Sequence, residues 1–253
     1  MSTTTQDLCN ALNDERFDDF VAGIKVAMAT DRNAINAEVV RAISGRLDQS
    51  QDSKQVSTLM SILSWIASAD LPLSGVRPAG FYNICVQMLE KRPSGFGGLT
   101  GHVGIVSSTI LESDPAVLDE RFLESLELAF KKVERPLSFP AFGSGGELMP
   151  CLDACVTACS INPILYRQKM PHRALEGYIT APDITDEEVS NFGFALLCNF
   201  VNPILDKGNS VSALILPQTI VRLRGVFSSA AKLYVSSTTA ADLNRMLDRI
   251  NER

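Results

Sequence analysis

Residues 166–173 bring one aromatic ring, three cations and a histidine into a single short stretch. Its candidates for nucleic-acid contact are Tyr166, Arg167, Lys169, His172 and Arg173. Arginine and lysine pair with phosphate oxygens, and a tyrosine ring offers a face on which an unpaired base stacks. A second basic segment contributes Arg222, Arg224 and Lys232. These residue types predict a surface that binds nucleic acid by pairing with phosphates and stacking a base, and the alternative is that both segments are solvated connectors.

Three cysteines precede this stretch at a spacing that lines one face of a helix. Cys151, Cys155 and Cys159 stand four residues apart. Structural zinc sites instead take a close pair of cysteines from a turn and a second pair from elsewhere in the chain. The spacing therefore favours reduced thiols in a helical core, and we predict no metal and no cofactor. A cysteine nucleophile needs a neighbouring base, and neither His102 nor His172 lies in a recognisable catalytic motif.

Two glycine-rich segments, residues 95–104 and 143–146, have a composition that phosphate-binding loops also use. A phosphate cradle requires a strand before the glycines and a helix after them, and a P-loop adds Lys-Ser/Thr. Residues 81–92 before the first segment have a helical pattern that ends at Pro93, and the Lys-Ser/Thr pair is missing. We therefore expect hinges or connectors at these glycines, and we expect the chain not to be an enzyme.

Helical periodicity dominates the chain. Apolar residues recur at the spacing of one helix face in residues 5–29, 36–47, 53–69, 114–133 and 185–201. Thr185 and Glu188 fit a capping box at the start of the last of these segments. No long alternating strand pattern accompanies them. The sequence predicts an all-α fold, a two-lobed helical globular body with flexible terminal arms.

We expect three parts along this body. Residues 1–30 form an N-terminal helical arm or first helix, and residues 31–220 form a helical core. A hinge lies near 95–104 or 143–146, where the glycines gather. Residues 221–253 form a basic C-terminal helical segment.

The N-terminal segment carries an apolar stripe that suits self-assembly. The stripe comprises Leu8, Leu12 and Phe20, with acidic residues between them. Residues 1–80 contain seven Lys or Arg and ten Asp or Glu, whereas residues 213–253 contain six and three. If the stripe docks on a neighbouring subunit, the contact is heterologous and builds a ring or a filament. The alternative is that this helix packs on its own body.

Composition is typical of a soluble globular protein. Of the 253 residues, 45% are hydrophobic and 21% are charged, which is enough for a full core. No run reaches the roughly 18 apolar residues of a membrane span, and residues 1–20 lack the pattern of a signal peptide. We therefore expect a cytoplasmic protein with reduced cysteines and no membrane partner. The net charge of −6 argues against a simple polyanion-coating protein.

Two stretches resemble a viral family in order and spacing. FPAFGSGGELMPCLDACV and YRQKMPHRALEGYITAPDITDEEVSNFGFALLCNF are similar to the core of filamentous plant-virus coat proteins of the potyvirus type. The nucleoproteins of phlebovirus-like segmented viruses are similar in length and in their all-helical plan. Both families polymerise through chain-end arms and hold single-stranded RNA in a basic groove between helical lobes. The sequence departs from the RNA pocket twice, because LMPCLDACV lacks the family's arginine and Leu196 replaces its aspartate.

The resemblance implies a self-assembling structural protein of nucleocapsid or coat type. Such a protein binds single-stranded RNA without sequence preference and forms a homo-oligomer, in the cytoplasm or in a virion. The residues themselves leave a second hypothesis open, in which the chain is a cytoplasmic helical scaffold that binds other proteins and no nucleic acid.

Overall fold

The three-dimensional structure is a computed structural model. The described residues are 3–50, 52–69, 71, 73, 99–133, 142–229 and 237–251. Within these ranges every regular element is helical and no strand occurs, which confirms the predicted all-α class. None of the helices described is long and apolar enough to cross a membrane. The helix predicted over residues 81–92 and the predicted contact residue Lys232 lie outside the described residues.

Helices follow one another along the described parts of the chain. The described α-helices are α1 (Thr5–Ala11), α2 (Phe17–Thr30), α3 (Ala37–Gln49), α4 (Ser53–Ser68), α6 (Leu99–Ser113), α7 (Glu120–Lys131), α8 (Phe142–Ile161), α9 (Pro163–Lys169), α10 (Arg173–Ile179), α11 (Asp186–Leu196), α12 (Asn202–Asp206), α13 (Pro217–Ser228) and α14 (Ser237–Asn251). Three other helical turns lie among them: the 3₁₀ turns η1 (Arg32–Ala34) and η2 (Pro115–Val117), and the π-helical turn η3 (Leu197–Val201).

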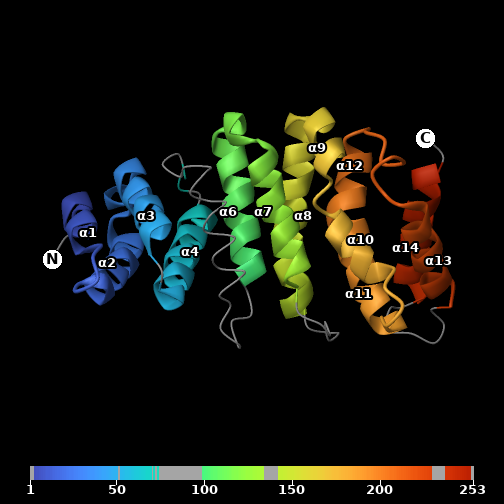
Figure 1. The fold of residues 1–253 in the computed structure, drawn as a ribbon, viewed down its shortest axis with the longest axis horizontal. Helices are drawn as coiled ribbons and strands as arrows, with labels where there is room; N and C mark the ends of the chain where they lie inside the picture. The colour runs from blue at the N-terminus through green and yellow to red at the C-terminus, as the bar shows by residue number, and fades with distance from the viewer. Residues whose placement is uncertain are drawn as a thin grey trace.

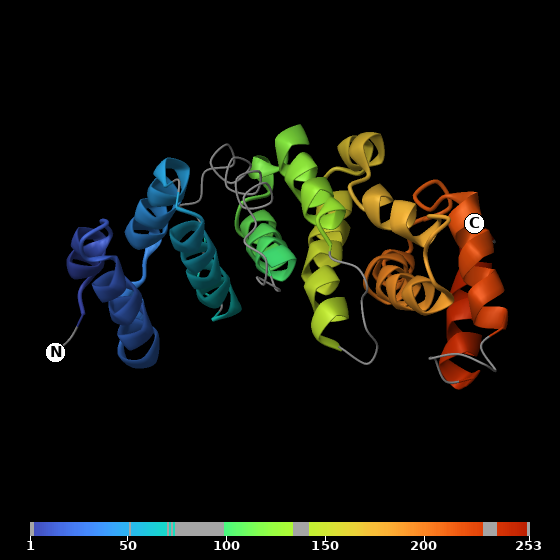
Figure 2. The ribbon, with the colours of Figure 1, turned by 60° about the horizontal axis from the view of Figure 1, so that its bottom comes forward.

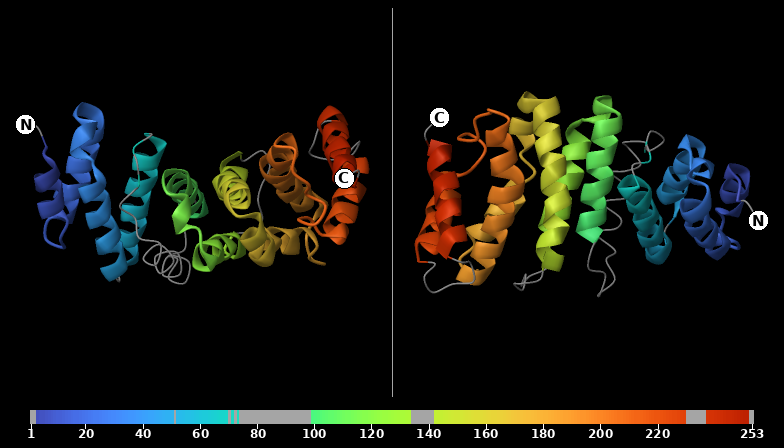
Figure 3. Two further views of the ribbon diagram at one scale, coloured as in Figure 1. Left: turned by 90° about the horizontal axis from the view of Figure 1, so that it is seen from above. Right: turned by 180° about the vertical axis from the view of Figure 1, so that it is seen from behind.

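The helices form a curved row that broadly follows the chain, with the two termini at opposite ends (Figure 1). Packing runs along the row, from α3 to α4, α4 to α6, α6 to α8, α8 to α11 and α11 to α13. Figure 2 shows the same succession from a tilted view. Seen from above the row is an arc, with α7 on its convex side and α6 and α8 toward its concave side (Figure 3). The division into two lobes stays a prediction.

The N-terminal segment folds as two helices where the sequence predicted one. Thr4 and Asp7 form a capping box at the start of α1, because each side chain accepts a hydrogen bond from the other residue's backbone N–H. The Thr5 hydroxyl donates to the Ala34 carbonyl at 2.9 Å. Helix α1 is therefore fastened to η1 of its own chain.

The apolar stripe predicted for self-assembly lies inside the chain. Leu8 and Phe20 are fully buried, and Leu12 packs against the same core. Helix α1 contacts both α2 and α3, so these apolar faces cover one another. The structure therefore has the packing on the chain's own body that the sequence left as the alternative, and it does not present Leu8 or Phe20 to a neighbouring subunit.

Helices α6 and α8 approach each other closely. Gly104 faces the backbone of α8, and a Cβ atom there would lie 2.3 Å from the Cys151 nitrogen. Only a residue without a side chain allows this approach. Residues 99–104 and 142–146 are helical, in place of the hinges that the glycines suggested, whereas residues 95–98 lie outside the described ranges. Helix packing therefore explains Gly104 better than a flexible turn.

The C-terminal half begins with the predicted capping box. The Thr185 hydroxyl accepts from the Glu188 N–H, and the Glu188 carboxylate accepts from the Thr185 N–H, which confirms the prediction. Further along, α13 begins at Pro217, where a missing N–H breaks no helical bond. Helices α11 and α13 also pack closely, since a Cβ on Gly193 would lie 2.2 Å from the Leu223 side chain.

Candidate functional site

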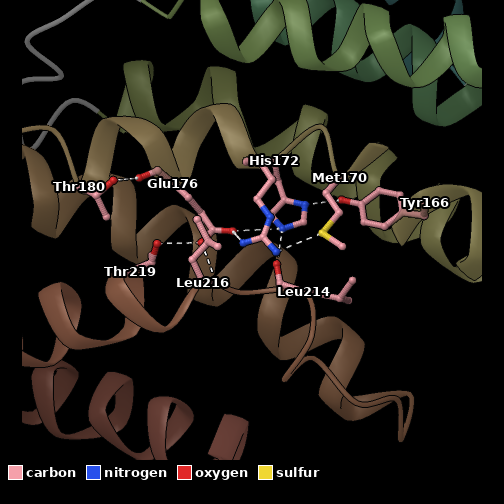
Figure 4. Close-up of polar contacts among 9 residues, drawn as sticks. Tyr166, Met170, His172, Glu176, Thr180, Leu214, Leu216 and Thr219 are labelled. Atoms are coloured by element: carbon pink, nitrogen blue, oxygen red, sulfur yellow. Dashed lines mark hydrogen bonds and ion pairs between the residues drawn. The ribbon is translucent and has the colours of Figure 1, made fainter. Parts of the chain in front are cut away.

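The stretch with the strongest chemical signal in the sequence forms a buried polar network (Figure 4). Tyr166 and His172 have no exposed surface. The Tyr166 hydroxyl lies 2.7 Å from His172 Nδ1, and His172 Nε2 lies 2.7 Å from the Leu214 carbonyl oxygen. A carbonyl only accepts, so Nε2 donates, and in the neutral ring Nδ1 accepts the tyrosine proton. Both ring nitrogens are therefore used within the fold.

Glu176 completes the other side of this network. Its Oε2 accepts from the Leu216 N–H at 2.8 Å and from the Thr219 hydroxyl at 2.7 Å. Its Oε1 pairs with Arg173 at 2.9 Å and lies 3.5 Å from His172 Nε2. Burial alone would raise the pKa of Glu176, but hydrogen bonds from His172, Leu216 and Thr219 outweigh it and hold the pKa below its usual value. The fold therefore keeps a buried carboxylate in its charged form.

A left-handed turn places His172 in the network. Met170 ends α9 with a φ of 39°, a conformation that residues other than glycine seldom adopt. The Met170 sulfur accepts a hydrogen bond from Arg173 at 3.2 Å, which adds support to this turn. The chain therefore reverses sharply between α9 and α10, and His172 comes to lie beside Tyr166.

Tyr166 links the network to the cysteine helix α8. Burial raises the pKa of Cys155 to about 12, although a hydrogen bond with Tyr166 acts in the opposite direction. Burial, reinforced by Cys155, also raises the pKa of Tyr166 well above its usual value. The His172 ring centroid lies 5.7 Å from that of Tyr166 and 4.3 Å from that of Phe200. The cluster of Cys155, Tyr166 and His172 is thus part of the core and lacks the thiolate that a cysteine nucleophile requires.

Most of the predicted phosphate contacts are held in ion pairs within the chain. The pairs are Lys169 with Glu120 and Glu124, Arg173 with Glu176, Arg222 with Asp186, and Arg224 with Asp248. Their N–O separations lie between 2.5 and 3.1 Å. Arg167 is exposed and has no ion-pair partner among the described residues. The structure therefore does not gather these cations into one free basic surface.

The burial of Tyr166 and His172 is incompatible with the contacts that the sequence predicted for them. A base can stack only on a ring face that is free, and neither ring has one in this structure. The aromatic and basic residues alternate in the sequence, but α9 turns the aromatic ring inward and the cations outward. Direct contact of these two rings with RNA would require the core to open.

The cysteine stripe has the expected environment. Cys151 and Cys155 are buried free thiols, and Cys159 is partly buried. In the part of the chain that the structure describes, no group of three or more His, Cys, Asp or Glu residues is arranged to hold a metal ion.

A pocket of about 350 Å³ lies near the N-terminal end, between the α1–α2 connection and the start of α4. Its carboxylates are Asp14, Glu15, Asp18 and Asp52. Asp14 pairs with Arg46 and accepts from the Gln55 amide at 2.9 Å. These contacts, the Gln55 hydrogen bond first, lower the pKa of Asp14. The pocket is acidic, so it does not suit a phosphate.

Exposed or partly exposed side chains of α4, α6 and α8 form a different surface, which we call the concave face and define by Ser61, Trp65, Glu112, Met149 and Asp153. Helices α4, α6 and α8 stand side by side there, on the side away from α7 (Figure 3). The sequences of α6 and α8 contain no lysine or arginine. Glu112 and Asp153 have no ion-pair partner among the described residues. The concave face is therefore acidic along its two central helices.

The two carboxylates of the concave face influence each other. Partial burial, and after it the charge of Glu112, raises the pKa of Asp153. The charged form of Asp153 is therefore less stable than that of an isolated surface carboxylate, and a cation beside it would offset that loss.

Apolar side chains accompany these acids. Trp65 is 41% exposed and Met149 is 42% exposed. The Lys25 ammonium lies 6.0 Å from the centroid of the Trp65 ring. Ser61 Oγ lies 3.3 Å from His102 Nε2, which joins α4 to α6, and burial lowers the pKa of His102. The concave face thus combines exposed apolar surface with unpaired negative charge.

No protein-family model, curated protein sequence or solved structure matches this chain. The resemblance to viral coat proteins and nucleoproteins stays a prediction.

The acidic residues of the buried network and of the concave face were not singled out from the sequence. Glu176 stands four residues after His172 and three after Arg173, which is the spacing of neighbours on a helix. Its contacts with these two residues could therefore have been predicted from the sequence. The lack of any cation over residues 99–113 and 142–161 was readable too. The electrostatic interaction of Glu112 with Asp153 could not be predicted, because 40 residues of chain separate the two positions.

Proposed function

We propose that the chain is a helical scaffold that binds a segment of another protein along the concave face. The observation that carries the proposal is the uncovered surface of α4, α6 and α8, with exposed Trp65 and Met149 and no cation on α6 or α8. Curved rows of helices offer extended concave surfaces of this kind to their partners.

The nucleocapsid hypothesis finds less support in the arrangement of charges. A protein that coats RNA neutralises phosphates with free lysine and arginine side chains. Four of the predicted cations are engaged with carboxylates, and Arg167 stands without such a partner among the described residues. A phosphate backbone laid on α6 and α8 would also meet the charges of Glu112 and Asp153. For this reason we propose that the bound partner is a protein and not RNA.

A position-specific crosslinking experiment tests the proposal. A photoactivatable phenylalanine analogue replaces Met149 on the concave face in one protein and Arg121 on the convex helix α7 in a control. After irradiation in cells, we expect a discrete protein adduct from position 149 and none from position 121. Mass spectrometry then identifies both partners of the adduct and the site of attachment.

The same preparations test the competing hypothesis. We expect purified protein without a 260 nm excess and without retention of single-stranded RNA at low salt. RNA crosslinked at position 149 would overturn the proposal in favour of the nucleocapsid hypothesis. So would retained RNA that is lost in an Arg167→Glu variant.

A further inference from the structure

We infer that the segment bound on the concave face is a cationic amphipathic peptide, with a lysine or arginine between Glu112 and Asp153 and an apolar side chain on Met149. This inference rests on the proposed function and names the chemistry of the partner. It follows from the face on which α6 and α8 expose their side chains, from the charges of Glu112 and Asp153, which have no ion-pair partner among the described residues, and from the poorer fit of other ligands.

The first step is that the exposed residues of α6 and α8 lie on one face. On α8, Met149, Asp153, Thr157 and Ser160 are exposed or partly exposed and recur at the spacing of one helix face, and Pro150, Cys159 and Ile161, next to them in the sequence, are partly exposed too. On α6 the corresponding residues are His102, Ile105, Thr109 and Glu112, and Ser108 and Ser113, next to them in the sequence, are also partly exposed or exposed. Gly104 points at the backbone of α8 and so fixes the rotation of α6. Both stripes then lie opposite α7, which packs on the other side of the two helices.

The second step concerns charge. Glu112 and Asp153 belong to adjacent helices, and neither has an ion-pair partner in the described part of the chain. Partial burial, and after it the charge of Glu112, disfavours the charged form of Asp153. A cationic side chain seated between them would be attracted by both carboxylates at once, in surroundings less screened than open solvent. Charge complementarity therefore selects a positively charged segment.

The third step concerns apolar contact. Met149 stands one helical turn before Asp153 on the same stripe of α8, and it is 42% exposed. Methionine adapts its shape to different apolar partners, and such residues are frequent on surfaces that bind amphipathic helices. A partner with an apolar residue one turn from its cation matches this spacing.

Other ligands fit these residues less well. Two carboxylates alone do not make a metal site, and no group of three potential ligands occurs among the described residues. A phosphate would add negative charge to an acidic face. A neutral apolar peptide would cover the two carboxylates without pairing them, and this burial of unpaired charge costs free energy.

The test uses Trp65, because it is the chain's single tryptophan and it lies on the concave face. The probe is a short amphipathic peptide of lysine and leucine that lacks tryptophan, titrated into the full chain while Trp65 emission is recorded. A second peptide has glutamine at every lysine position and keeps the leucines. We expect the lysine peptide to shift Trp65 emission and the glutamine peptide to bind at least about tenfold more weakly.

Two matched double variants show which acidic residues attract the cations of the peptide. Glu112→Gln with Asp153→Asn removes two charges from the concave face, and Glu15→Gln with Asp18→Asn removes two from the N-terminal pocket. We expect the first pair to weaken the lysine peptide about tenfold and the second to leave its affinity within about twofold. Circular dichroism checks that each variant keeps its helical content.

The outcomes separate this inference from the proposed function. If both peptides shift Trp65 emission with equal affinity, polypeptide binding to the concave face stands and the cationic partner is refuted. If the pocket variant loses affinity and the concave variant does not, the cation binds at the N-terminal pocket and the inference fails. If neither peptide changes Trp65 emission, the inference fails, and the crosslinking experiment still decides the scaffold function separately.

Discussion

The α9–α10 region and the concave face use their polar groups in opposite ways. In the α9–α10 region, Tyr166, His172 and Glu176 are fully buried, and their side-chain oxygen and nitrogen atoms all have partners within the chain. On the concave face, Glu112 and Asp153 remain without ion-pair partners among the described residues. The first region therefore stabilises the fold, whereas the second is available to another molecule.

This difference shows why a chemically rich stretch is not necessarily a site. Buried polar groups must be hydrogen-bonded, so a fold that buries an aromatic–histidine–acid cluster uses up its chemistry internally. The helices α6 and α8 contain few charged residues and have an unremarkable sequence. Their interest comes from charges that the fold leaves uncompensated on an exposed surface.

The largest expected effect is on the α9–α10 region. Glu176→Ala leaves Arg173, Thr219 and the Leu216 N–H without their acceptor, so we expect a loss of about 3–5 kcal/mol of unfolding free energy, as for a broken buried ion pair. Denaturation in urea measures the loss. Thr219→Val serves as the control and should cost about 1–2 kcal/mol, because it removes one hydrogen bond. A Glu176→Ala protein as stable as the parent would mean that the network is not a structural one.

The next effect concerns the layer that supports the concave face. Gly104→Ala places a methyl group 2.3 Å from the Cys151 nitrogen and must separate α6 from α8, so we expect a loss of about 1–3 kcal/mol. Thermal unfolding measures it. Gly45→Ala and Gly225→Ala are matched controls on helices where nothing lies within 4 Å of the new methyl, and each should stabilise the chain by about 0.5–1 kcal/mol. Equal effects at all three glycines would contradict the close approach of α6 and α8.

A third effect depends on pH, because the pKa of Glu176 in the α9–α10 region is lowered, whereas the pKa of Asp153 on the concave face is raised. The pKa of Glu176 is lowered in the folded chain, so its stabilising contribution is present above its unfolded pKa of about 4.5 and is lost as the pH falls through the folded value. As the pH falls from about 4.5 through the folded pKa of Glu176, the free energy of unfolding should therefore decrease more in the parent than in the Glu176→Gln variant. Urea midpoints measured across a pH series for both proteins supply the test, and parallel curves would contradict it.

The smallest effect is on the concave face and has the opposite sign. The pKa of Asp153 is raised in the folded chain, so its charge disfavours folding above the folded pKa, and this cost disappears below the unfolded value near 3.8. Asp153→Asn should thus stabilise the free protein at neutral pH, by no more than about 1 kcal/mol because the residue is solvent-accessible. A destabilised variant in the same denaturation assay would show that Asp153 has a structural partner.

Several features of the fold were predictable because they depend on residues close together in the sequence. Helical periodicity identified the all-α class, and the Thr185–Glu188 capping box was recognised from its spacing. The burial of Cys151 and Cys155 followed from their recurrence on one helix face. The split of residues 5–29 into α1 and α2 was missed, because both helices have the same apolar periodicity across the turn between them.

Which polar groups are free was decided only by tertiary structure. The sequence by itself determined helix type, the order of the elements and the residue types of the basic stretch. It did not determine that Glu124 of α7 would reach Lys169 of α9, that Leu214 and Thr219 would contact the α9–α10 region, or that Gly104 of α6 would lie against the backbone of α8. Each of these contacts joins segments distant in the chain. Local propensity carries no information about such partners, and the availability of a charge depends on whether the fold supplies one.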